Sequence, residues 1–381
     1  MKILMVSVFH HHFFNWVLQL EKAGHEIYWF DIADSNTYMK KIDFVHQTVK
    51  WKIKIDYPGR YWIKRNLPIL YKLINKFNNR KFQKVFKEKL KEIQPDVVHS
   101  FEMHASCVPI LKELKKYPNI KWIYSSWGSD LYYYQRVPEK LKAMEAVFNR
   151  LDLMFADCDR DFYIAKKFGF KGKYLGTFPG GGGFDIHSQK LTVKNFEDRN
   201  IILIKGYQGK FGKCNNILDA IFKIKDELTD FRLVVFGANE NVLKFIEQPR
   251  FQAMENMEII GRISGREVLN LMGKSLIYIG NSISDGIPNT LLEAIIMGSF
   301  PIQSNPGGAT AEIIEHGKNG YLIENPENSN EIAALIKKAV QNPGLLKSGI
   351  EYNSKHIKPK LERNYIKEQV LNRYELIERN L

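Results

Sequence analysis

The sequence contains few cysteines and no long uninterrupted hydrophobic run. Cys107, Cys158 and Cys214 are the only cysteines among 381 residues, and none belongs to a Cys-x-x-Cys pair. This spacing argues against a disulfide framework and a zinc site, and it favours a reducing compartment. The apolar runs stay below the roughly 20 residues that span a bilayer, and the opening run at 1–9 is too short for a signal peptide. We therefore expect a cytoplasmic protein.

Acidic residues are scarce relative to basic ones. The chain has 56 Lys and Arg against 42 Asp and Glu, a net charge of +14. Such a balance favours an anionic partner, which could be nucleic acid, an acidic membrane surface or a phosphorylated small molecule. A helix-turn-helix, RRM or zinc motif is missing, and so is the Gly-x-Gly-x-x-Gly turn of dinucleotide oxidoreductases. A basic nucleic-acid-binding protein nevertheless stays open as an alternative from another class.

Short β-branched runs alternate with amphipathic stretches, a pattern that predicts βαβ units and parallel sheets. We expect a first series of strands at 3–9, 26–30, 96–100, 122–126 and 153–156. A second series is expected at 201–205, 231–236, 257–260, 276–280 and 300–303. A chain of this length usually divides into two cores, and the glycine-rich segment 178–185 separates the two series. The predicted domains are 1–187 and 188–360, followed by a helix at 361–381.

The segment after the expected strand 276–280 has the features of an anion-binding turn. A polar, glycine-containing loop leads from this strand into an expected helix at 288–297. Ligands of parallel sheets bind beyond the carboxyl ends of the strands, often at the amino end of the next helix. The backbone amides of Asn289, Thr290 and Leu291 would there bind a diphosphate. Gly286 would leave room for its close approach.

Two carboxylates, Asp285 and Glu293, flank this expected helix start. They are eight positions apart, which places Asp285 in the loop and Glu293 about one and a half turns into the helix. One could bind sugar hydroxyls and the other ribose hydroxyls, with the diphosphate between them. The pair also fits an N-capping Asp and a solvent-facing Glu on an ordinary helix. A further glycine-containing strand end at 300–309 favours the ligand site, whereas Glu312 is more typical of a surface residue.

This pattern of an acidic residue and a Glu separated by seven residues resembles the donor site of retaining GT-B glycosyltransferases of family 4. The resemblance extends to Ala294 after the Glu and to the small-residue turn and apolar strand that follow. The resemblance covers nearly the whole chain. It implies an α/β protein with two Rossmann-like, doubly wound domains facing a cleft and a C-terminal helix that returns to the N-terminal domain. It assigns Asp285 to the transferred sugar as a catalytic contact and Glu293 to the ribose. The family more often has Glu at the first of these positions.

The same resemblance implies a cation for the diphosphate after the first strand of the second domain. Family members usually carry an Arg and a Lys there, but Tyr207 stands in the place of the Arg. Lys213 is the expected catalytic cation, with Lys205 and Lys210 in reserve, because the leaving diphosphate gains negative charge. Each of these lysines could instead be a solvated surface group. Gly237, at the end of the next strand, is also assigned to donor binding.

The first half contributes candidates for the acceptor side. A Trp-Gly-Ser-Asp sequence at 127–130 resembles the His-Gly-x-Asp loop of the family, with Trp127 in place of the His. Asp130 could belong to the site or could cap the next helix.

Histidines gather after two of the expected strands. His10, His11 and His12 follow the first strand and are expected to line the cleft, although adjacent residues on a strand are poorly placed for one metal ion. His104 is expected in the site as a catalytic candidate. His99 is expected to be a buried hydrogen-bonding residue.

The stretch 57–93 is basic and rich in aromatic residues. Such a helix can lie on an anionic bilayer, and the alternative is a core-packed helix with solvated lysines.

The resemblance implies metal-independent, retaining transfer of a sugar from a nucleoside diphosphate sugar, expected to be a UDP-sugar. The acceptor would be a saccharide or lipid-linked saccharide of cell-surface glycan synthesis, at the inner face of the plasma membrane. No metal or other cofactor is expected. The rivals are other GT-B enzymes, a sugar-nucleotide epimerase or a sugar phosphate synthase.

Overall fold

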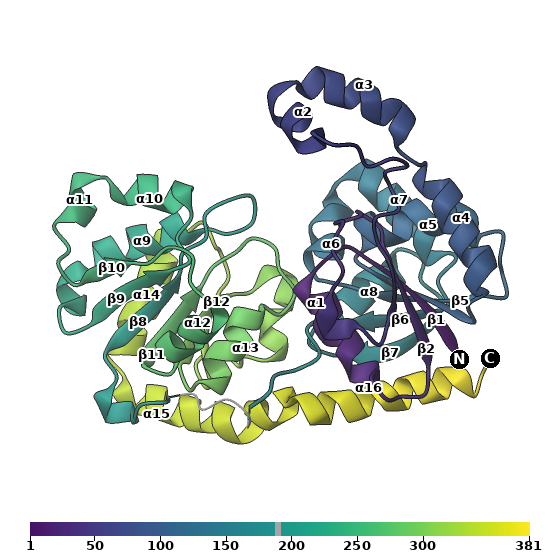
Figure 1. The fold of residues 1–381 in the computed structure, drawn as a ribbon. Helices are drawn as coiled ribbons and strands as arrows, with labels where there is room; N and C mark the ends of the chain where they lie inside the picture. Colours follow the sequence, from purple (N-terminus) through teal and green to yellow (C-terminus); the bar gives the residue numbers. More distant parts are fainter. Residues whose placement is uncertain (187–191) are drawn as a thin grey trace. The chain divides into compact units, whose positions relative to one another are not determined.

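Figure 1 shows a computed structural model of the protein, which describes residues 1–186 and 192–381. The chain forms two compact units. The first unit comprises Met1–Ala156, Phe162–Gly182 and Lys367–Leu381, and the second comprises Asp157–Asp161 and Gly183–Ile366. The domain boundary expected at 187/188 lies outside the described residues. The chain leaves the first unit between Gly182 and Gly183, whose φ values of +69° and +80° favour glycine.

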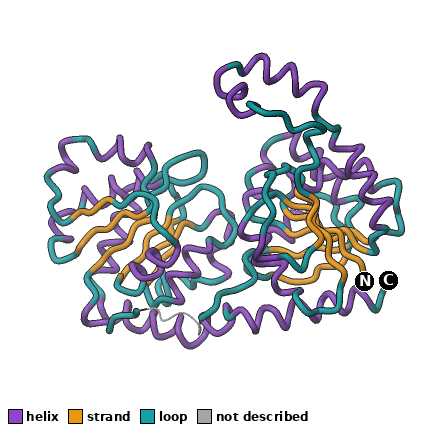
Figure 2. Tube along the Cα trace, in the orientation of Figure 1, coloured by secondary structure: helices purple, strands orange, loops and turns teal. Residues whose placement is uncertain are grey.

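The first unit is built on a parallel sheet of seven strands in the order β3-β2-β1-β4-β5-β6-β7 (Figure 2). The strands are β1 (Lys2–Ser7), β2 (Glu26–Asp31), β3 (His46–Thr48), β4 (Val97–Phe101), β5 (Lys121–Ser125), β6 (Leu153–Ala156) and β7 (Lys173–Thr177). Apolar strand residues such as Leu4, Val6 and Val98 are fully buried and pack against the helices. The expected strands are present within two residues, but β3 and β7 were not predicted. β3 has only three residues, His-Gln-Thr, and therefore carries little hydrophobic signal.

Helices cover this sheet on both faces. The helices of the unit are α1 (His11–Val17), α2 (Arg60–Asn66), α3 (Pro68–Asn78), α4 (Phe82–Ile93), α5 (Val108–Leu114), α6 (Ser129–Tyr132), α7 (Pro138–Phe148), α8 (Asp159–Lys167) and α16 (Arg363–Glu378), and of these α2 and α3 project away from the sheet. Helix α8 begins in the second unit, and α16 joins the first unit from Lys367 onward.

The C-terminal helix α16 is anchored in the first unit by one tyrosine. The hydroxyl of Tyr374 is fully buried, lies 2.6 Å from Nδ1 of His99 and accepts a hydrogen bond from Nε1 of Trp16 at 3.3 Å. The other ring nitrogen of His99 lies 2.8 Å from the Ser125 hydroxyl. Burial lowers the pKa of His99 to about 3, so the ring is neutral. His99 is thus a buried hydrogen-bonding residue, as predicted.

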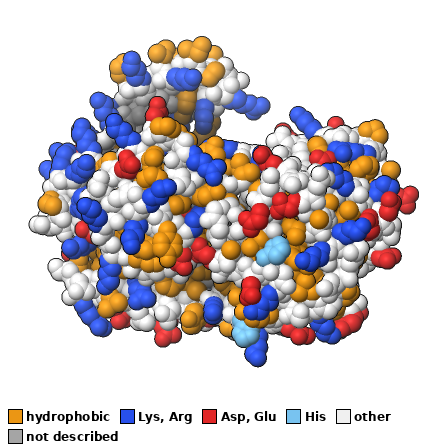
Figure 3. Space-filling model, turned by 180° about the vertical axis from the view of Figure 1, so that it is seen from behind, with side chains coloured by type: hydrophobic (Ala, Val, Ile, Leu, Met, Phe, Trp, Pro, Cys, Tyr) orange, Lys and Arg blue, Asp and Glu red, His pale blue; other side chains and the backbone are white. Residues whose placement is uncertain are grey.

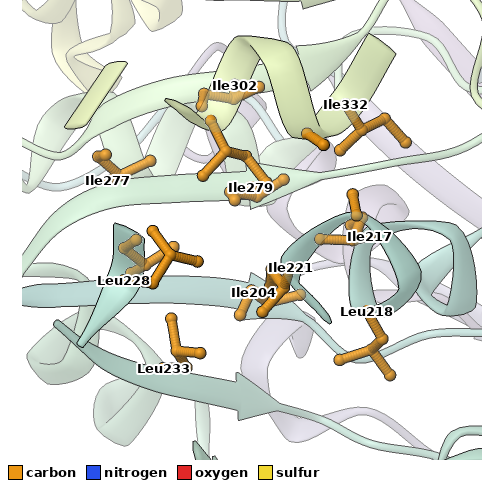
Figure 4. Packing of buried hydrophobic residues seen from close by; sticks show 14 of the residues in the cluster. Ile204, Ile217, Leu218, Ile221, Leu228, Leu233, Ile277, Ile279, Ile302 and Ile332 are labelled. Atoms are coloured by element: carbon orange, nitrogen blue, oxygen red, sulfur yellow. The ribbon is translucent and has the colours of Figure 1, made fainter. Parts of the chain in front are cut away.

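The second unit contains a parallel sheet of six strands in the order β10-β9-β8-β11-β12-β13. The strands are β8 (Ile201–Lys205), β9 (Arg232–Phe236), β10 (Met257–Ile259), β11 (Ser275–Gly280), β12 (Phe300–Ser304) and β13 (Tyr321–Ile323). The helices are α9 (Cys214–Lys223), α10 (Glu240–Ile246), α11 (Pro249–Gln252), α12 (Gly265–Met272), α13 (Asn289–Ile296), α14 (Ser329–Val340) and α15 (Pro343–Tyr352). Figure 4 shows Ile204, Ile277 and Ile279 of the sheet packing with Ile217 and Ile221 of α9.

Both sheets are doubly wound, which confirms the predicted pair of Rossmann-like domains. In the second sheet the strand order reverses between β8 and β11, and such a reversal point is where α/β sheets bind ligands. Lys205 ends β8 and Gly280 ends β11, so the segments after these residues start at that point. Among the described residues, no helix is long and apolar enough to cross a membrane.

Candidate functional site

The loop from β11 to α13 carries the two predicted carboxylates. Pro288 is the N-cap of α13 instead of a residue of its first turn, and the helix begins at Asn289. The Leu291 amide donates to the Pro288 carbonyl at 3.0 Å. The prediction that the Leu291 amide binds phosphate was therefore wrong, because the first turn already uses that donor. Asn289 and Thr290 are the first two residues of the helix, where anions are bound.

A buried tyrosine that the sequence did not single out orients this first turn. Tyr278 of β11 is fully buried, and its hydroxyl donates to the Thr290 hydroxyl at 2.9 Å. Because Tyr278 sits in the middle of the sheet, this bond fixes the helix start to the strand beneath it.

Asp285 and Glu293 are both partly buried. Burial raises the pKa of Glu293 from 4.5 to about 7, and the nearby charge of Lys205 opposes the shift. Burial also raises the pKa of Asp285, against the effects of Lys205 and of a hydrogen bond from the Gly286 amide at 3.0 Å. Two carboxylates with raised pKa values around one lysine are typical of a functional site.

The structure changes the order of the three predicted lysines. Lys205 is the one whose charge acts on both carboxylates. The ammonium of Lys213 lies 2.7 Å from the exposed Glu327 carboxylate, and that of Lys210 lies over the Phe211 ring. Lys205 is therefore the better placed cation, and Lys213 would have to exchange Glu327 for a phosphate.

Two predicted glycines have different surroundings. A methyl group at Gly286 would overlap the carboxylate of Asp157, so the close approach there is made by a side chain and not by a ligand as expected. Gly237 has a φ of +66° in the turn after β9, and the space next to its Cα is open.

Arg160 is a buried residue of this region that the sequence reasoning missed. Its Nη1 donates to the carbonyls of Asp285 at 2.8 Å and Pro306 at 2.6 Å, while Nη2 lies 2.7 Å from the Asp161 carboxylate. Glu312 accepts the Arg160 amide at 2.9 Å. Arg160 thereby connects the loops after β11 and β12. No local motif predicts this role, because the two loops that Arg160 connects are more than a hundred positions away in the sequence.

Within the described residues, Asp157, Cys158 and Asp161 form the one group with the spacing of a metal site. Arg160 already neutralises Asp161. Burial and then the two carboxylates raise the pKa of the Cys158 thiol. The group therefore fits the Arg160 ion pair better than it fits a metal ion.

In the first unit, His10 and His12 gather around Trp127. The two imidazoles stack at 4.7 Å between ring centres, and Trp127 lies 5.1 Å from His10 and 5.8 Å from His12. Burial, with a contribution from neighbouring histidines, lowers the pKa of His10 and brings that of His12 to about 4. The rings are neutral and offer both donors and acceptors.

The three histidines after β1 do not share one face. His10 is the N-cap of α1, accepting the His12 amide at Nδ1, and the helix begins at His11. The His11 ring lies edge-on to Phe14, away from the Trp127 group. A helix start separates the side chains of consecutive residues, so only His10 and His12 share a face.

Asp130 in α6 and His104 in the helical turn after β4 belong to the same unit. The Asp130 carboxylate accepts the Tyr124 hydroxyl at 2.6 Å and the amides of Met103 at 2.8 Å and Trp127 at 3.0 Å. Asp130 thus holds the loops after β4 and β5 together and is not presented to a ligand, which corrects its assignment to the acceptor site. Burial and then the charge of Lys140 lower the pKa of His104 to about 4.

Glu102 is another residue that the motifs did not reveal. Its φ of +70° and ψ of 134° are rarely adopted by residues other than glycine, and its carboxylate caps the Ala105 amide. Burial raises the pKa of this carboxyl group. Strained backbone of this kind concentrates at functional sites, and Glu102 immediately follows β4.

The basic stretch 57–93 divides into three helices with different environments. Val85, Phe86 and Leu90 of α4 are buried, so α4 is a core-packed helix and cannot lie on a membrane. In α2 and α3, Trp62 is 62% exposed, Ile69 is 77% exposed, and Phe77 is 74% exposed. These two helices project from the first unit, and hydrophobic and basic side chains cover them (Figures 1 and 3).

Solved structures share this architecture. Sucrose-phosphate synthase from Thermosynechococcus elongatus is 14% identical with a TM-score of 0.73, and each chain is covered completely. The complex of Anabaena HepE with UDP-glucose is 13% identical with a TM-score of 0.70, covering 98% of this chain and 99% of that one. At such identities the likeness shows the fold, which is that of the GT-B class of glycosyltransferases.

Family models then identify the chain more narrowly. Residues 187–356 match the family of Glycosyl transferases group 1, and residues 2–158 match the Glycosyl transferase 4-like family. Each of these two parts of the chain thus matches a glycosyltransferase family, and the protein is a glycosyltransferase. Spore coat protein SA of Bacillus subtilis is 28% identical over 146 residues, which span 36% of this chain and 38% of that relative.

Proposed function

We propose that the protein transfers a sugar from a nucleoside diphosphate to a saccharide acceptor, with retention at the anomeric carbon and without a metal ion. The observation that carries the proposal is the pair of partly buried carboxylates, Asp285 before the α13 amino end and Glu293 after it. The positive charge of Lys205 acts on both of them. The family matches support it, and the HepE structure contains UDP-glucose, which supports UDP as the nucleotide.

In this proposal each donor group has a counterpart in the second unit. The amides of Asn289 and Thr290 and the positive end of the helix bind the diphosphate, and Lys205 neutralises the charge that develops on it. Glu293 accepts hydrogen bonds from the ribose hydroxyls, and Asp285 accepts those of the transferred sugar.

Transfer then needs no separate protein base. The bond from the anomeric carbon to the phosphate oxygen breaks, and the acceptor oxygen bonds to the same face of that carbon. The acceptor proton passes to the leaving phosphate, which keeps the charges balanced. The first unit would hold the acceptor, with the neutral rings of His10 and His12 and the Trp127 indole as its contacts. His104 stays a candidate for orienting the acceptor hydroxyl.

The proposal is tested by calorimetric titration with UDP-, GDP- and ADP-sugars, followed by assays of nucleoside diphosphate release. Release that depends on an added saccharide and continues in EDTA supports metal-independent transfer. An epimerase would convert the donor sugar without releasing nucleotide. Failure of every nucleotide sugar to bind would reject the donor site itself.

Glu293→Gln provides a pH-dependent test of the ribose contact. With a pKa near 7, the Glu293 carboxylate ionises as the pH rises through 7. If ribose hydroxyls bind the ionised form, UDP-sugar affinity should increase by up to about tenfold from pH 6 to pH 8. Glu293→Gln should bind more weakly at pH 8 and lose this dependence. Calorimetry across this range gives the measurement, and an unchanged pH profile in the variant would contradict the assignment.

A second prediction concerns docking of α2 and α3 on the cytoplasmic face of an anionic membrane, where a lipid-linked acceptor would be found. Trp62→Ser with Phe77→Ser should weaken sedimentation with phosphatidylglycerol vesicles by about tenfold, because both exposed rings enter the interface. The control, Tyr163→Ser with Leu243→Ser, removes exposed apolar side chains elsewhere. Equal losses in the two pairs would reject a specific membrane surface.

A further inference from the structure

The first unit contains a cavity of about 510 Å³ that no part of the donor chemistry uses. It lies between the segment after β2, the segment after β3, and helices α2 and α3. Its volume is within the range of about 300–1,000 Å³ that is typical of small-molecule sites.

Cationic side chains dominate the lining of this cavity. Lys50, Lys52, Arg60 and Lys64 all contribute to it. None of these three lysines forms an ion pair with any of the residues that the structure describes. Unpaired ammonium groups that converge on one cavity favour an anionic ligand.

The two carboxylates of the cavity do not neutralise these lysines. Asp34 accepts the backbone amides of Lys50 at 2.6 Å and Lys52 at 2.7 Å, so it is occupied in shaping the loop. Asp56 pairs with the Arg60 guanidinium at 3.1 Å, and Arg60 also donates to the Tyr61 hydroxyl at 2.9 Å. Asp34 still carries its negative charge, so the four cationic residues and two carboxylates of the lining leave a net charge of +2.

Two polar atoms of lining residues indicate the rest of the ligand. The Asn75 Oδ1 and the Ser35 hydroxyl are buried and have no hydrogen-bond partner within the described part of the chain. A buried polar atom without a partner costs about 1–3 kcal/mol. The Asn75 oxygen requires a donor, and sugar hydroxyls both donate and accept.

The cavity also lies on the functional edge of the first sheet. Ser35 follows β2 and Lys50 follows β3, just as His10 follows β1. In a parallel sheet these carboxyl ends share one edge, where ligands bind. The cavity thus continues the edge that carries His10, His12 and Trp127.

We propose that this cavity binds a phosphate-bearing saccharide, with the phosphate at Lys50, Lys52 and Lys64 and the hydroxyls at Asn75 and Ser35. This proposal rests on the proposed function, in which the first unit holds the acceptor, and it assigns an anionic acceptor to the enzyme. The phosphate could belong to a soluble sugar phosphate or to the headgroup of a lipid-linked saccharide.

The test is calorimetry on the full chain with glucose 6-phosphate and with glucose, in the presence of excess UDP. Glucose 6-phosphate should bind at least about tenfold more tightly than glucose, because the charge-assisted contacts require the phosphate. Lys50→Gln with Lys64→Gln should remove this preference, and Asn75→Ala should weaken binding of the sugar phosphate. The matched control, Lys72→Gln with Lys76→Gln, removes the same amount of charge from α3 outside the cavity. This control should keep the preference for glucose 6-phosphate over glucose.

A second arm uses phosphatidylcholine vesicles doped with a polyprenyl-phosphate sugar. The phosphate belongs to a lipid if only these vesicles bind and if the double substitution of Lys50 and Lys64 weakens that binding. The double substitution of Lys72 and Lys76 should then leave the binding unchanged. Equal effects of the two pairs, or no binding of either probe to the wild type, would overturn the proposal. Titration with UDP-glucose separates the two hypotheses, because donor binding should persist in every cavity variant and its absence would instead reject the donor site.

Discussion

Replacing Asp285 with Asn should lower turnover by about 10²–10³-fold, a loss comparable to that of removing one group that stabilises a developing charge. The change keeps the size of the side chain but removes the negative charge that we propose faces the transferred sugar. The bond from Arg160 goes to the Asp285 carbonyl, so the variant retains it and the loop should keep its shape. Hydrolysis of the bound UDP-sugar by water measures the effect without a known acceptor.

An Asp-to-Asn substitution on the surface serves as the control for Asp285→Asn. Asp226→Asn changes a carboxylate that is 87% exposed and should hydrolyse the donor at the wild-type rate. UDP affinity should also be nearly unchanged in Asp285→Asn, because the proposed nucleotide contacts come from Glu293 and the α13 amides. Wild-type hydrolysis by a well-folded Asp285→Asn protein would show that another residue contacts the sugar.

Replacing Arg160 with Met should lower the free energy of unfolding of the second unit by about 3–5 kcal/mol. The change leaves the fully buried Asp161 carboxylate without its cation and removes the donor from the Asp285 and Pro306 carbonyls. Urea unfolding monitored by circular dichroism gives the measurement. Donor affinity should fall as well, because both loops at the site lose their shared anchor.

The chain offers a matched control for Arg160. Arg232 pairs with Glu258 at 2.8 Å, but both side chains are more than half exposed. Arg232→Met should therefore cost at most about 1 kcal/mol, as surface ion pairs do. Adding Asp161→Leu to Arg160→Met should recover part of the loss, since it removes the unpaired charge. A cost for Arg160→Met no larger than for Arg232→Met would contradict the anchoring role.

The strands were predictable because their hydrophobic pattern is local. Every residue of β11 is buried, and its sequence Ser-Leu-Ile-Tyr-Ile-Gly shows this as a nearly continuous apolar run. The three-residue strands β3 and β13 were not predicted, and each pairs with a neighbouring strand that offers hydrogen bonds.

The spacing of Asp285 and Glu293 was likewise readable from the sequence, because a strand, a turn and a helix determine it over nine residues. The cation was not. Lys213 follows the family pattern, but Glu327, 114 positions away, binds it, and Lys205 is the lysine whose charge reaches both carboxylates. Ion pairs depend on distances in space, which sequence separation does not give.

The sequence by itself determined the two doubly wound domains and the acidic pair at the start of α13, since both follow from periodicity and turn chemistry over short stretches. Only the tertiary structure decided that Arg160 connects the loops after β11 and β12, that Asp130 is held by hydrogen bonds, and that α4 is core while α2 and α3 are exposed. These outcomes depend on burial and on contacts between distant segments. Burial shifts the pKa values of Asp285, Glu293 and His12, and it exists only once the sheets have assembled.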